Sequence, residues 1–336
     1  MTIEILKCPN CGYPLPESVR ANQLLHCEAC GSTLYLSDWK IGEGKDAILV
    51  ATPTRVYTVS TLLTKDDLCY VYRCAFGADD QTWQGLFRIA RSADDNDLVQ
   101  NEASALYHLQ AQPDYRDFRP FLPQVLESFL YQDAASPRAR QVNIVSLHEY
   151  IASPSELYAL EEVHAYYPSG IDARDMAWMW RRLLNILGFV HRSRVVHGAV
   201  LPGHVLIEPK EHKLALANWA FAVRDPQTGK RLQAISVPYE AWYPPELKQP
   251  VPPTPGLDLF MAARCMLYLL GDDPLDAPSA RHMEPELQRY FARCLEPDPA
   301  RRPQNAWGLL QDFDRIIEQL WGPRRFREFT MPYKPD

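Results

Sequence analysis

The sequence of 336 residues has no long hydrophobic run, no secretory signal pattern and no excess of positive charge. Its longest apolar stretch, residues 257–270, contains Asp258 and Arg264 and is too short to cross a bilayer, so it predicts a buried helix. The first residues, MTIEILKCPN, lack the apolar core of a signal peptide. Because the formal net charge is −7, no overall field favours nucleic acid or an anionic membrane surface.

Low-complexity tracts and internal repeats are also absent from the sequence. With 46% hydrophobic residues, the chain can form the core of one large domain, or of two lobes beside a small module. Eight cysteines without a secretory signal indicate a reducing compartment, where paired cysteines bind metal more often than they form disulfides. We therefore expect a cytoplasmic protein.

Four of the cysteines form two C-x2-C pairs near the start of the chain, Cys8 with Cys11 and Cys27 with Cys30. Two thiolates on one tight turn can hold an ion, and the glycine that follows each pair lets the turn close with a positive φ. The spacing predicts a structural zinc site with no open position. So short a segment buries too little apolar surface to fold alone, and the metal would contribute about 10 kcal/mol or more.

This module resembles a zinc ribbon, a class whose members bind nucleic acid, bind proteins or brace a larger fold. Its only cations before Lys40 are Lys7 and Arg20. Nucleic-acid binding depends on neutralising phosphates, so we favour protein contact or bracing.

The next hundred residues carry the patterns of several strands and one helix. The strands are expected at Tyr57–Leu63, Cys69–Phe76, Trp83–Ala90, Val125–Tyr131 and Gln141–Leu147. A polar turn, residues 64–67, separates the first two. The helix is expected at Asn96–Gln110, with apolar residues on one side.

The remainder of the chain is mainly helical in pattern. Asp172–His191 predicts an amphipathic helix with an acid at its start and cations at its end. After it, the stretch HRSRVVHGAVLPGHVLIEP (residues 191–209) reads as a strand, a loop stiffened by Pro202, and a second strand. Such a loop can present side chains to a cleft.

Residues 191–209 resemble the catalytic loop of the protein kinases, H-R-D-x-K-P-x-N followed by three apolar residues. His197 and Pro202 match the first His and the Pro. The remaining positions differ from the motif: Gly198, Ala199, Leu201 and His204 stand at the Arg, the catalytic Asp, the Lys and the Asn.

Four later segments resemble the same family. Asn218, Trp219 and Ala220 stand where kinases have D-F-G, and Tyr243-Pro-Pro-Glu246 resembles A-P-E. Asp258 opens the apolar helix as its counterpart does in kinases, and residues 294–303 resemble the family's segment that ends in Arg-Pro. The resemblance implies a buried ion pair between Glu246 and Arg302. It implies structural roles for His197, Trp219, Glu246, Asp258 and Arg302, the first two as packed core residues.

The strand-rich region differs from the family at the positions that bind the nucleotide in kinases. Thr64, Asp66 and Cys69 stand in place of the three glycines whose backbone approaches phosphates, and Asp66 with its neighbour Asp67 would repel a triphosphate. Arg88 replaces the Lys of V-A-I-K. A nucleotide, if one binds, would meet Val71, Leu86, Arg88, Glu102, Leu206 and Asn218. Arg88 and Glu102 are expected to pair, either holding the helix inward or as a surface ion pair of little energetic weight.

The resemblance implies an α+β fold, with a bilobal protein kinase-like body preceded by a zinc ribbon. Its expected parts are the ribbon (1–38), a linker (39–54), a β-rich N-lobe (55–147), a helical C-lobe (148–320) and a tail (321–336), with a hinge at 147–151. The tail is aromatic and basic on an acidic protein, a composition suited to docking on a partner or to folding back on the C-lobe.

The absence of the catalytic and metal-binding residues of kinases predicts a pseudokinase that acts as a protein-interaction scaffold or allosteric partner. Ala199 cannot act as general base, and neither His204 nor Asn218 supplies the charged oxygen that Mg²⁺ prefers. We expect structural zinc as the cofactor, without ATP or Mg²⁺.

An atypical ATP-binding serine/threonine kinase-like transferase is the alternative, with His204 as a base or a substitute acid among Glu208, Glu211, Asp225 and Glu240. Nucleic-acid binding through the ribbon is a weaker alternative, and no membrane partner is expected.

Overall fold

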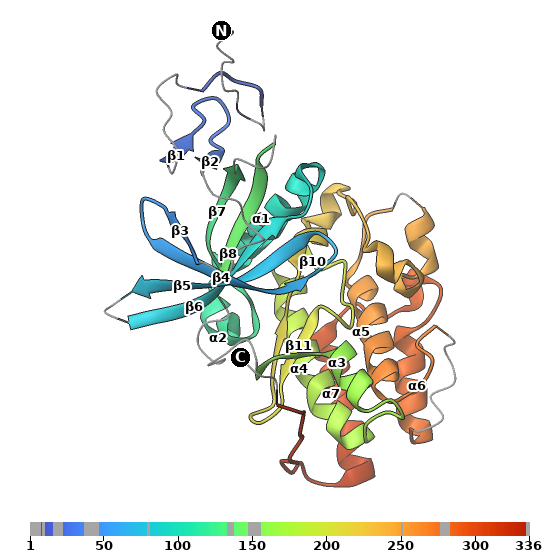
Figure 1. Ribbon diagram of the computed structural model, residues 1–336. Helices are drawn as coiled ribbons and strands as arrows, with labels where there is room; N and C mark the ends of the chain where they lie inside the picture. Colours follow the sequence, from blue (N-terminus) through green and yellow to red (C-terminus); the bar gives the residue numbers. More distant parts are fainter. Residues whose placement is uncertain are drawn as a thin grey trace. The chain divides into compact units, whose positions relative to one another are not determined.

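The computed structural model describes residues 8, 11–15, 23–36, 47–78, 81–132, 138–146, 156–249, 251–275 and 283–333. The chain divides into two compact units (Figure 1). The first consists of Met1–Ser104 and Gln124–His148, and the second of Ala105–Pro123 and Glu149–Asp336. The hinge expected at 147–151 lies outside the described residues, as do Lys7, Arg20 and Lys40.

The first unit is built on one curled sheet of eight strands in the order β1-β2-β7-β8-β6-β5-β4-β3 (Figure 1). All five strands expected from the sequence are present, although β4 runs two residues further than predicted, to Lys65, and shortens the turn that follows. The strands are β1 (Gln23–His26), β2 (Thr33–Leu36), β3 (Ile48–Ala51), β4 (Val56–Lys65), β5 (Cys69–Ala78), β6 (Gln81–Ala90), β7 (Gln124–Gln132) and β8 (Arg140–Ser146).

Alternating apolar residues on the strands form the core of this sheet. Tyr57 and Val59 on β4, Phe87 and Ile89 on β6, and Val142 and Ile144 on β8 are all buried within one cluster. Each pair is two residues apart, so both members point to the same face of their strand. The period-two pattern in the sequence is therefore the pattern of burial.

The cysteine-containing segment is part of the same sheet. Strands β1 and β2 form an antiparallel hairpin, and β2 pairs in parallel with β7, with Leu34 opposite Leu130. Leu34 and Leu130 are buried in a small cluster that also contains Cys8 and Cys27. The range 39–54, expected as a linker, includes β3, which pairs antiparallel with β4 and forms the other edge of the sheet.

Helix α1 (Asn96–Gln110) has the bounds expected from the sequence and follows a 3₁₀ helix at Ala93–Asp95. Its N-terminal end is tied to β8 in the first unit, because Asn96 donates to the Ala139 carbonyl and accepts from the Gln141 N–H, at 2.9 and 2.7 Å. These two bonds fix the position of the first turns of α1 against the sheet.

The second unit is mainly helical. Two small antiparallel sheets accompany the helices, in the orders β12-β11-β9 and β10-β13. The helices are α2 (Tyr115–Phe118), α3 (Leu160–Tyr166), α4 (Ala173–Arg192), α5 (Pro255–Leu269), α6 (Pro285–Cys294) and α7 (Ala306–Trp321). The strands are β9 (Tyr158–Ala159), β10 (Val195–Val196), β11 (Val205–Glu208), β12 (Lys213–Leu216) and β13 (Val223–Arg224).

Helix α4 is the amphipathic helix expected from the sequence. Asp172 caps it by accepting from the Arg174 N–H at 2.7 Å, as the acid at its start indicated. A side chain on Gly188 would put Cβ 2.3 Å from the indole nitrogen of Trp307, so this glycine allows α7 to approach α4 closely.

Helix α5 is the buried helix expected from the apolar stretch 257–270; it begins two residues earlier, at Pro255, and nearly all of its residues are buried. In the part of the chain that the structure describes, no helix is long and apolar enough to cross a membrane.

Candidate functional site

The four predicted zinc ligands come together in the first unit. The Sγ atoms of Cys8, Cys11, Cys27 and Cys30 all lie within 4.8 Å of one another, with Cys8 and Cys30 at 3.7 Å and Cys11 and Cys27 at 3.6 Å. Sulfurs at the corners of a tetrahedron around zinc, with Zn–S bonds of about 2.3 Å, are about 3.8 Å apart. The cluster therefore has the dimensions of a tetrahedral four-thiolate site.

The turns that hold these cysteines are a matched pair. Gly12 donates to the Cys8 carbonyl and Gly31 to the Cys27 carbonyl, both at 2.8 Å, and the two glycines have φ of 73° and 71°. Positive φ is the reason a glycine follows each pair. Hydrogen bonds to the side chain and backbone of Ser32 lower the pKa of the Cys30 thiol to about 6, whereas in Cys11 the backbone of Tyr13 lowers the pKa but burial and the neighbouring thiols raise it to about 12.

Arg88 on β6 and Glu102 on α1 form the ion pair expected between them. The Arg88 Nε donates to Glu102 Oε2 at 3.1 Å, and both side chains are more than nine-tenths buried. Asn143 on β8 also donates to Glu102 Oε2, at 2.9 Å, and to the Val99 carbonyl at 2.7 Å. The pair is thus an internal bond between the sheet and α1, and the surface alternative was wrong.

A second carboxylate, Asp66, also neutralises Arg88. Its Oδ2 lies 2.8 Å from Arg88 Nη1, while its Oδ1 accepts from the N–H groups of Leu68 and Cys69 at 3.0 and 2.7 Å. Burial lowers the pKa of Arg88, but the charges of Asp66 and Glu102 raise it well above its usual value, so the cation is permanent. The sequence interpretation treated Asp66 only as a repellent for phosphate and missed this pairing.

The loop that resembles the kinase catalytic loop is held by Asp258 at the start of α5. Its two carboxylate oxygens accept from the N–H groups of His197 and Gly198, both at 2.8 Å, and Oδ2 also contacts His191 Nε2 at 2.8 Å. Gly198 has φ of 76°, and a Cβ there would lie 2.6 Å from the Phe221 carbonyl oxygen. The loop therefore requires glycine at the position where the kinase motif has arginine.

His197 is a core residue, as the resemblance implied. It has no exposed surface, contacts the Ala217 carbonyl at 3.0 Å through Nε2, and packs edge-on against Trp219 with ring centres 4.5 Å apart. Burial lowers the pKa of His197 to about 4, so the ring is neutral at physiological pH. Trp219 is likewise fully buried and donates to the Leu216 carbonyl at 2.8 Å.

The two polar residues at the kinase metal positions bond to each other. The Asn218 amide nitrogen lies 2.9 Å from His204 Nε2, and His204 Nδ1 lies 2.9 Å from the Ala199 carbonyl oxygen. An amide nitrogen only donates, so Nε2 accepts and the proton is on Nδ1. Both ring nitrogens of His204 are thus committed. Ala199, at the position of the catalytic acid, is fully buried.

Three of the four candidate substitute acids are held in local contacts. Glu208 accepts from the N–H groups of Lys210 and Glu211, both at 2.9 Å, and caps the turn between β11 and β12. Glu211 pairs with Lys213 at 2.7 Å, and Asp225 with Arg194 at 3.3 Å. Glu240 is exposed in the 3₁₀ helix Val237–Trp242.

The other residues expected around a nucleotide divide between the two units. Val71 on β5 is buried and stands opposite Arg88 in the register with β6, where Leu86 is half-buried. Leu206 is half-buried on β11 of the second unit, opposite Ala215.

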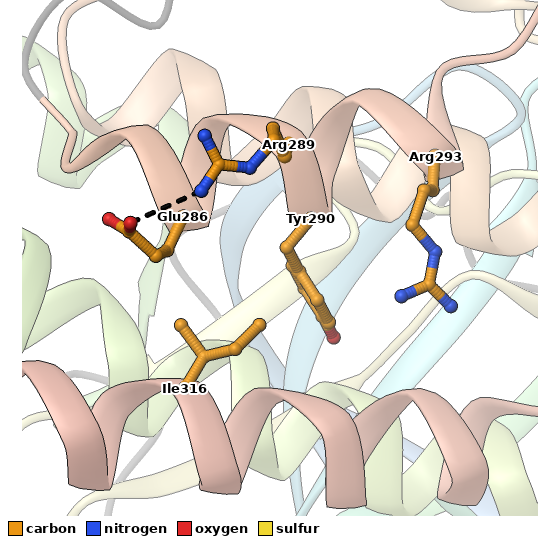
Figure 2. A pocket seen from close by; sticks show the side chains of 5 residues that line it. All are labelled: Glu286, Arg289, Tyr290, Arg293 and Ile316. Carbon is orange, nitrogen blue, oxygen red and sulfur yellow. Dashed lines mark hydrogen bonds and ion pairs between the residues drawn. The ribbon is translucent and has the colours of Figure 1, made fainter.

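Elsewhere on the second unit, a surface pocket of about 250 Å³ lies between α6 and α7. It is lined by Glu286, Arg289, Tyr290, Arg293 and Ile316 (Figure 2). Arg289 and Glu286 pair at 3.1 Å across its rim, and Arg293 pairs with Asp312. Its charges are therefore balanced internally, and none of the expected site residues lines it.

The comparisons with known proteins identify the fold. No family model matches the sequence, and no curated protein matches it. Among solved structures, that of vaccinia related kinase 3 is similar, with a TM-score of 0.61 and 15% sequence identity over 84% of this chain and 93% of the other. The α+β, protein kinase-like fold expected from the sequence is thereby confirmed, with a cysteine cluster that can hold a metal ion near its N-terminus.

Proposed function

We propose that this chain is a pseudokinase, a kinase-like protein without phosphoryl transfer that acts as a scaffold or allosteric partner of other proteins. One observation carries the proposal. The cation that stands at the kinase lysine position, Arg88, is already paired with both Asp66 and Glu102. A triphosphate would have to displace Asp66, which also caps its own turn through two N–H groups.

The second unit supports the same conclusion. Phosphoryl transfer depends on positioned charge and metal ions. Ala199 offers no base, and losing a general base costs about 10²- to 10⁴-fold in rate. His204 Nε2 accepts from the Asn218 amide, and neither residue offers the charged oxygen that Mg²⁺ prefers. The four-cysteine cluster supplies a structural zinc site, since four thiolates leave no position open for substrate.

Within this proposal the chain is organised as zinc ribbon, β-rich N-lobe, helical C-lobe and tail, and works in the cytoplasm. The ion pair between Glu246 and Arg302, and the Asp258 bonds to the loop at 197–198, serve to keep the body rigid. A rigid body with its charges paired internally is suited to presenting fixed surfaces to protein partners.

A nucleotide titration tests the absence of catalysis. The melting temperature of the full chain is followed against ATP, alone and with Mg²⁺ or Mn²⁺, and we expect no saturable increase. Any ligand that binds the folded chain must raise its apparent stability. Saturable stabilisation, or metal-dependent transfer of phosphate that Asn218→Ala abolishes, would support the atypical transferase instead.

Affinity capture tests the scaffold role. The full chain, immobilised and exposed to a native lysate of its source, should retain at least one protein in near-stoichiometric amount. The matched control is the same chain after metal removal, which should retain less of any partner that contacts the ribbon. Stoichiometric capture of nucleic acid in place of protein would overturn the assignment.

A further inference from the structure

The C-terminal tail, residues 322–333, lies in an extended conformation against the second unit. Its first part is held by charge. Arg327 Nε donates to Asp175 Oδ1 at 2.7 Å and approaches Asp172 at 3.6 Å, while Arg324 pairs with Asp314 at 2.9 Å. Two of the three tail arginines, Arg324 and Arg327, are therefore paired within the chain.

An aromatic contact follows the arginines. Phe329 is only 6% exposed and packs against Tyr167, with ring centres 5.6 Å apart. Phe326, by contrast, is 68% exposed and covers His212, which stacks on Trp178 from its other side, with both ring separations 4.4 Å. Phe329 is thus an anchor of the tail, and Phe326 is a cover that solvent reaches.

Beyond Phe329, two tyrosine hydroxyls of the second unit bond to the main chain of the tail. The hydroxyl of Tyr167 donates to the Thr330 carbonyl at 2.8 Å, and the hydroxyl of Tyr158 donates to the Pro332 carbonyl at 2.7 Å. Every peptide carries these carbonyls, so the two tyrosines would accept many sequences. Specificity comes from the arginine and the phenylalanine two residues after it.

We propose that this surface, the tail groove formed by Tyr158, Tyr167, Asp172, Asp175 and His212, is a docking site for an extended segment of a partner protein. The segment carries Arg-x-Phe and offers main-chain carbonyls one and three residues after the Phe. The tail of this chain occupies the groove until such a partner displaces it. The inference rests on the proposed interaction role and names the surface that performs it.

Charge and exposure favour an exchangeable tail. The groove presents Asp172 and Asp175 to the arginine, and the Arg327 side chain keeps 40% of its surface exposed while paired. Exposed ion pairs form and break readily in water. The tail joins α7 at Gly322, which has φ of 75°, and tethering of this kind gives an effective concentration on the order of 1 mM.

The effective concentration of the tethered tail determines how strongly it competes with a free segment for the tail groove. If a free segment binds the empty groove with a Kd on the order of 10 µM, an occupant at about 1 mM weakens its apparent affinity about 100-fold. The intact chain should therefore bind a free segment poorly, and a chain whose own tail is released should bind it well.

The experiment uses the full chain with Arg327→Glu and Phe329→Ala as the tail-released variant. A labelled synthetic peptide of residues 323–333 is titrated against it and against the unchanged chain, followed by fluorescence anisotropy. Trypsin cleavage at Arg324 and Arg325 confirms that the tail is released, and thermal melting confirms that the fold is retained. We expect saturable binding to the released variant, at least tenfold tighter than to the unchanged chain.

Two matched controls define the groove. Adding Asp175→Arg to the released variant should abolish peptide binding, and a peptide with Arg327→Asp should then recover part of it. Failure of the peptide to bind a released, folded chain would overturn the proposal, as would equal binding to released and unchanged chains or a tail that stays protected from trypsin. None of these failures affects the ATP titration, so the absence of catalysis is judged separately.

Discussion

Arg302 and Glu246, 56 residues apart in the chain, form a two-bond ion pair in which Nη2 donates to Oε2 at 2.9 Å and Nη1 donates to Oε1. The Arg302 side chain has no exposed surface and also donates to the carbonyls of Glu296 and Pro297, at 2.6 and 2.9 Å. Its guanidinium lies over the ring of Phe260 at 4.6 Å. Every donor group of this arginine thus has a partner.

Removing Glu246 should therefore be costly. Glu246→Ala leaves a buried guanidinium without its counter-charge, and we expect the free energy of unfolding to fall by about 3–5 kcal/mol. Urea unfolding measures the change. The matched control is Glu286→Ala, which breaks the exposed pair with Arg289 on α6 and should cost less than about 1 kcal/mol. Equal losses in the two variants would contradict the assignment of Glu246 and Arg302 as a structural brace.

His197 should make the fold sensitive to acid. Burial lowers its pKa to about 4 in the folded chain, against 6.5 for the unperturbed side chain. Between these values the unfolded chain binds a proton that the folded chain does not, so stability is lost as pH falls from 6.5 towards 4. The loss at pH 4 is at most about 3 kcal/mol.

Urea unfolding of the unchanged chain and of His197→Asn at pH 7 and pH 4.5 checks this. The drop in stability between the two pH values should be smaller in the variant, because asparagine does not titrate. The rest of the chain is identical in the two proteins, so the difference between the two drops reports the removal of the His197 imidazole. An identical drop in both would show that His197 does not set the acid sensitivity.

Asp66 can be tested for its charge alone. Asp66→Asn keeps an oxygen for the N–H groups of Leu68 and Cys69 but removes the negative charge beside Arg88. We expect a loss of about 1–3 kcal/mol in urea unfolding, because the hydrogen bond to a charged group is replaced by a neutral one. Asp67→Asn removes a charge one residue away and is the matched control. A larger effect from Asp67→Asn would mean that Asp66 does not neutralise Arg88.

Metal removal should lower the thermal stability of the first unit. Elemental analysis of the full chain should give one zinc per molecule, and a strong chelator should remove it and lower the melting temperature until zinc is restored. Cys30→Ser should lower the zinc content, whereas Cys294→Ala, a change in a buried cysteine of α6, should leave it at one. Full zinc content in Cys30→Ser would exclude the four-cysteine site.

Local sequence patterns predicted the helices and strands, but not all of the residues that they contact. The periodicity of residues 96–110 and 172–191 located α1 and α4 within one residue, because an amphipathic helix repeats its apolar positions over short distances. The motif resemblance placed Glu246 with Arg302, since both belong to family segments. In the candidate site, the zinc ligands followed from spacing and the Arg88–Glu102 pair from the same resemblance.

The features that were missed have no local signal. The parallel pairing of β2 with β7 joins residues almost a hundred positions apart, and nothing near Leu34 specifies Leu130 as its neighbour. The bond from Tyr158 to the Pro332 carbonyl involves main chain that every residue possesses. The sequence suggested only how Asp66 would affect a ligand, whereas its partner in the structure is Arg88 on β6. Such contacts depend on the folded arrangement.

The parallel pairing of β2 with β7 has a practical consequence for anyone who shortens this protein. A chain that begins after residue 40, to obtain the kinase-like body alone, would lack β2, one of the two neighbours of β7, and would expose Leu130. An exposed edge strand with apolar side chains pairs with edge strands of other molecules, and the protein then aggregates. The small cysteine-containing module thus also forms one edge of the larger sheet. Recombinant protein that lacks it should be recovered as insoluble aggregates.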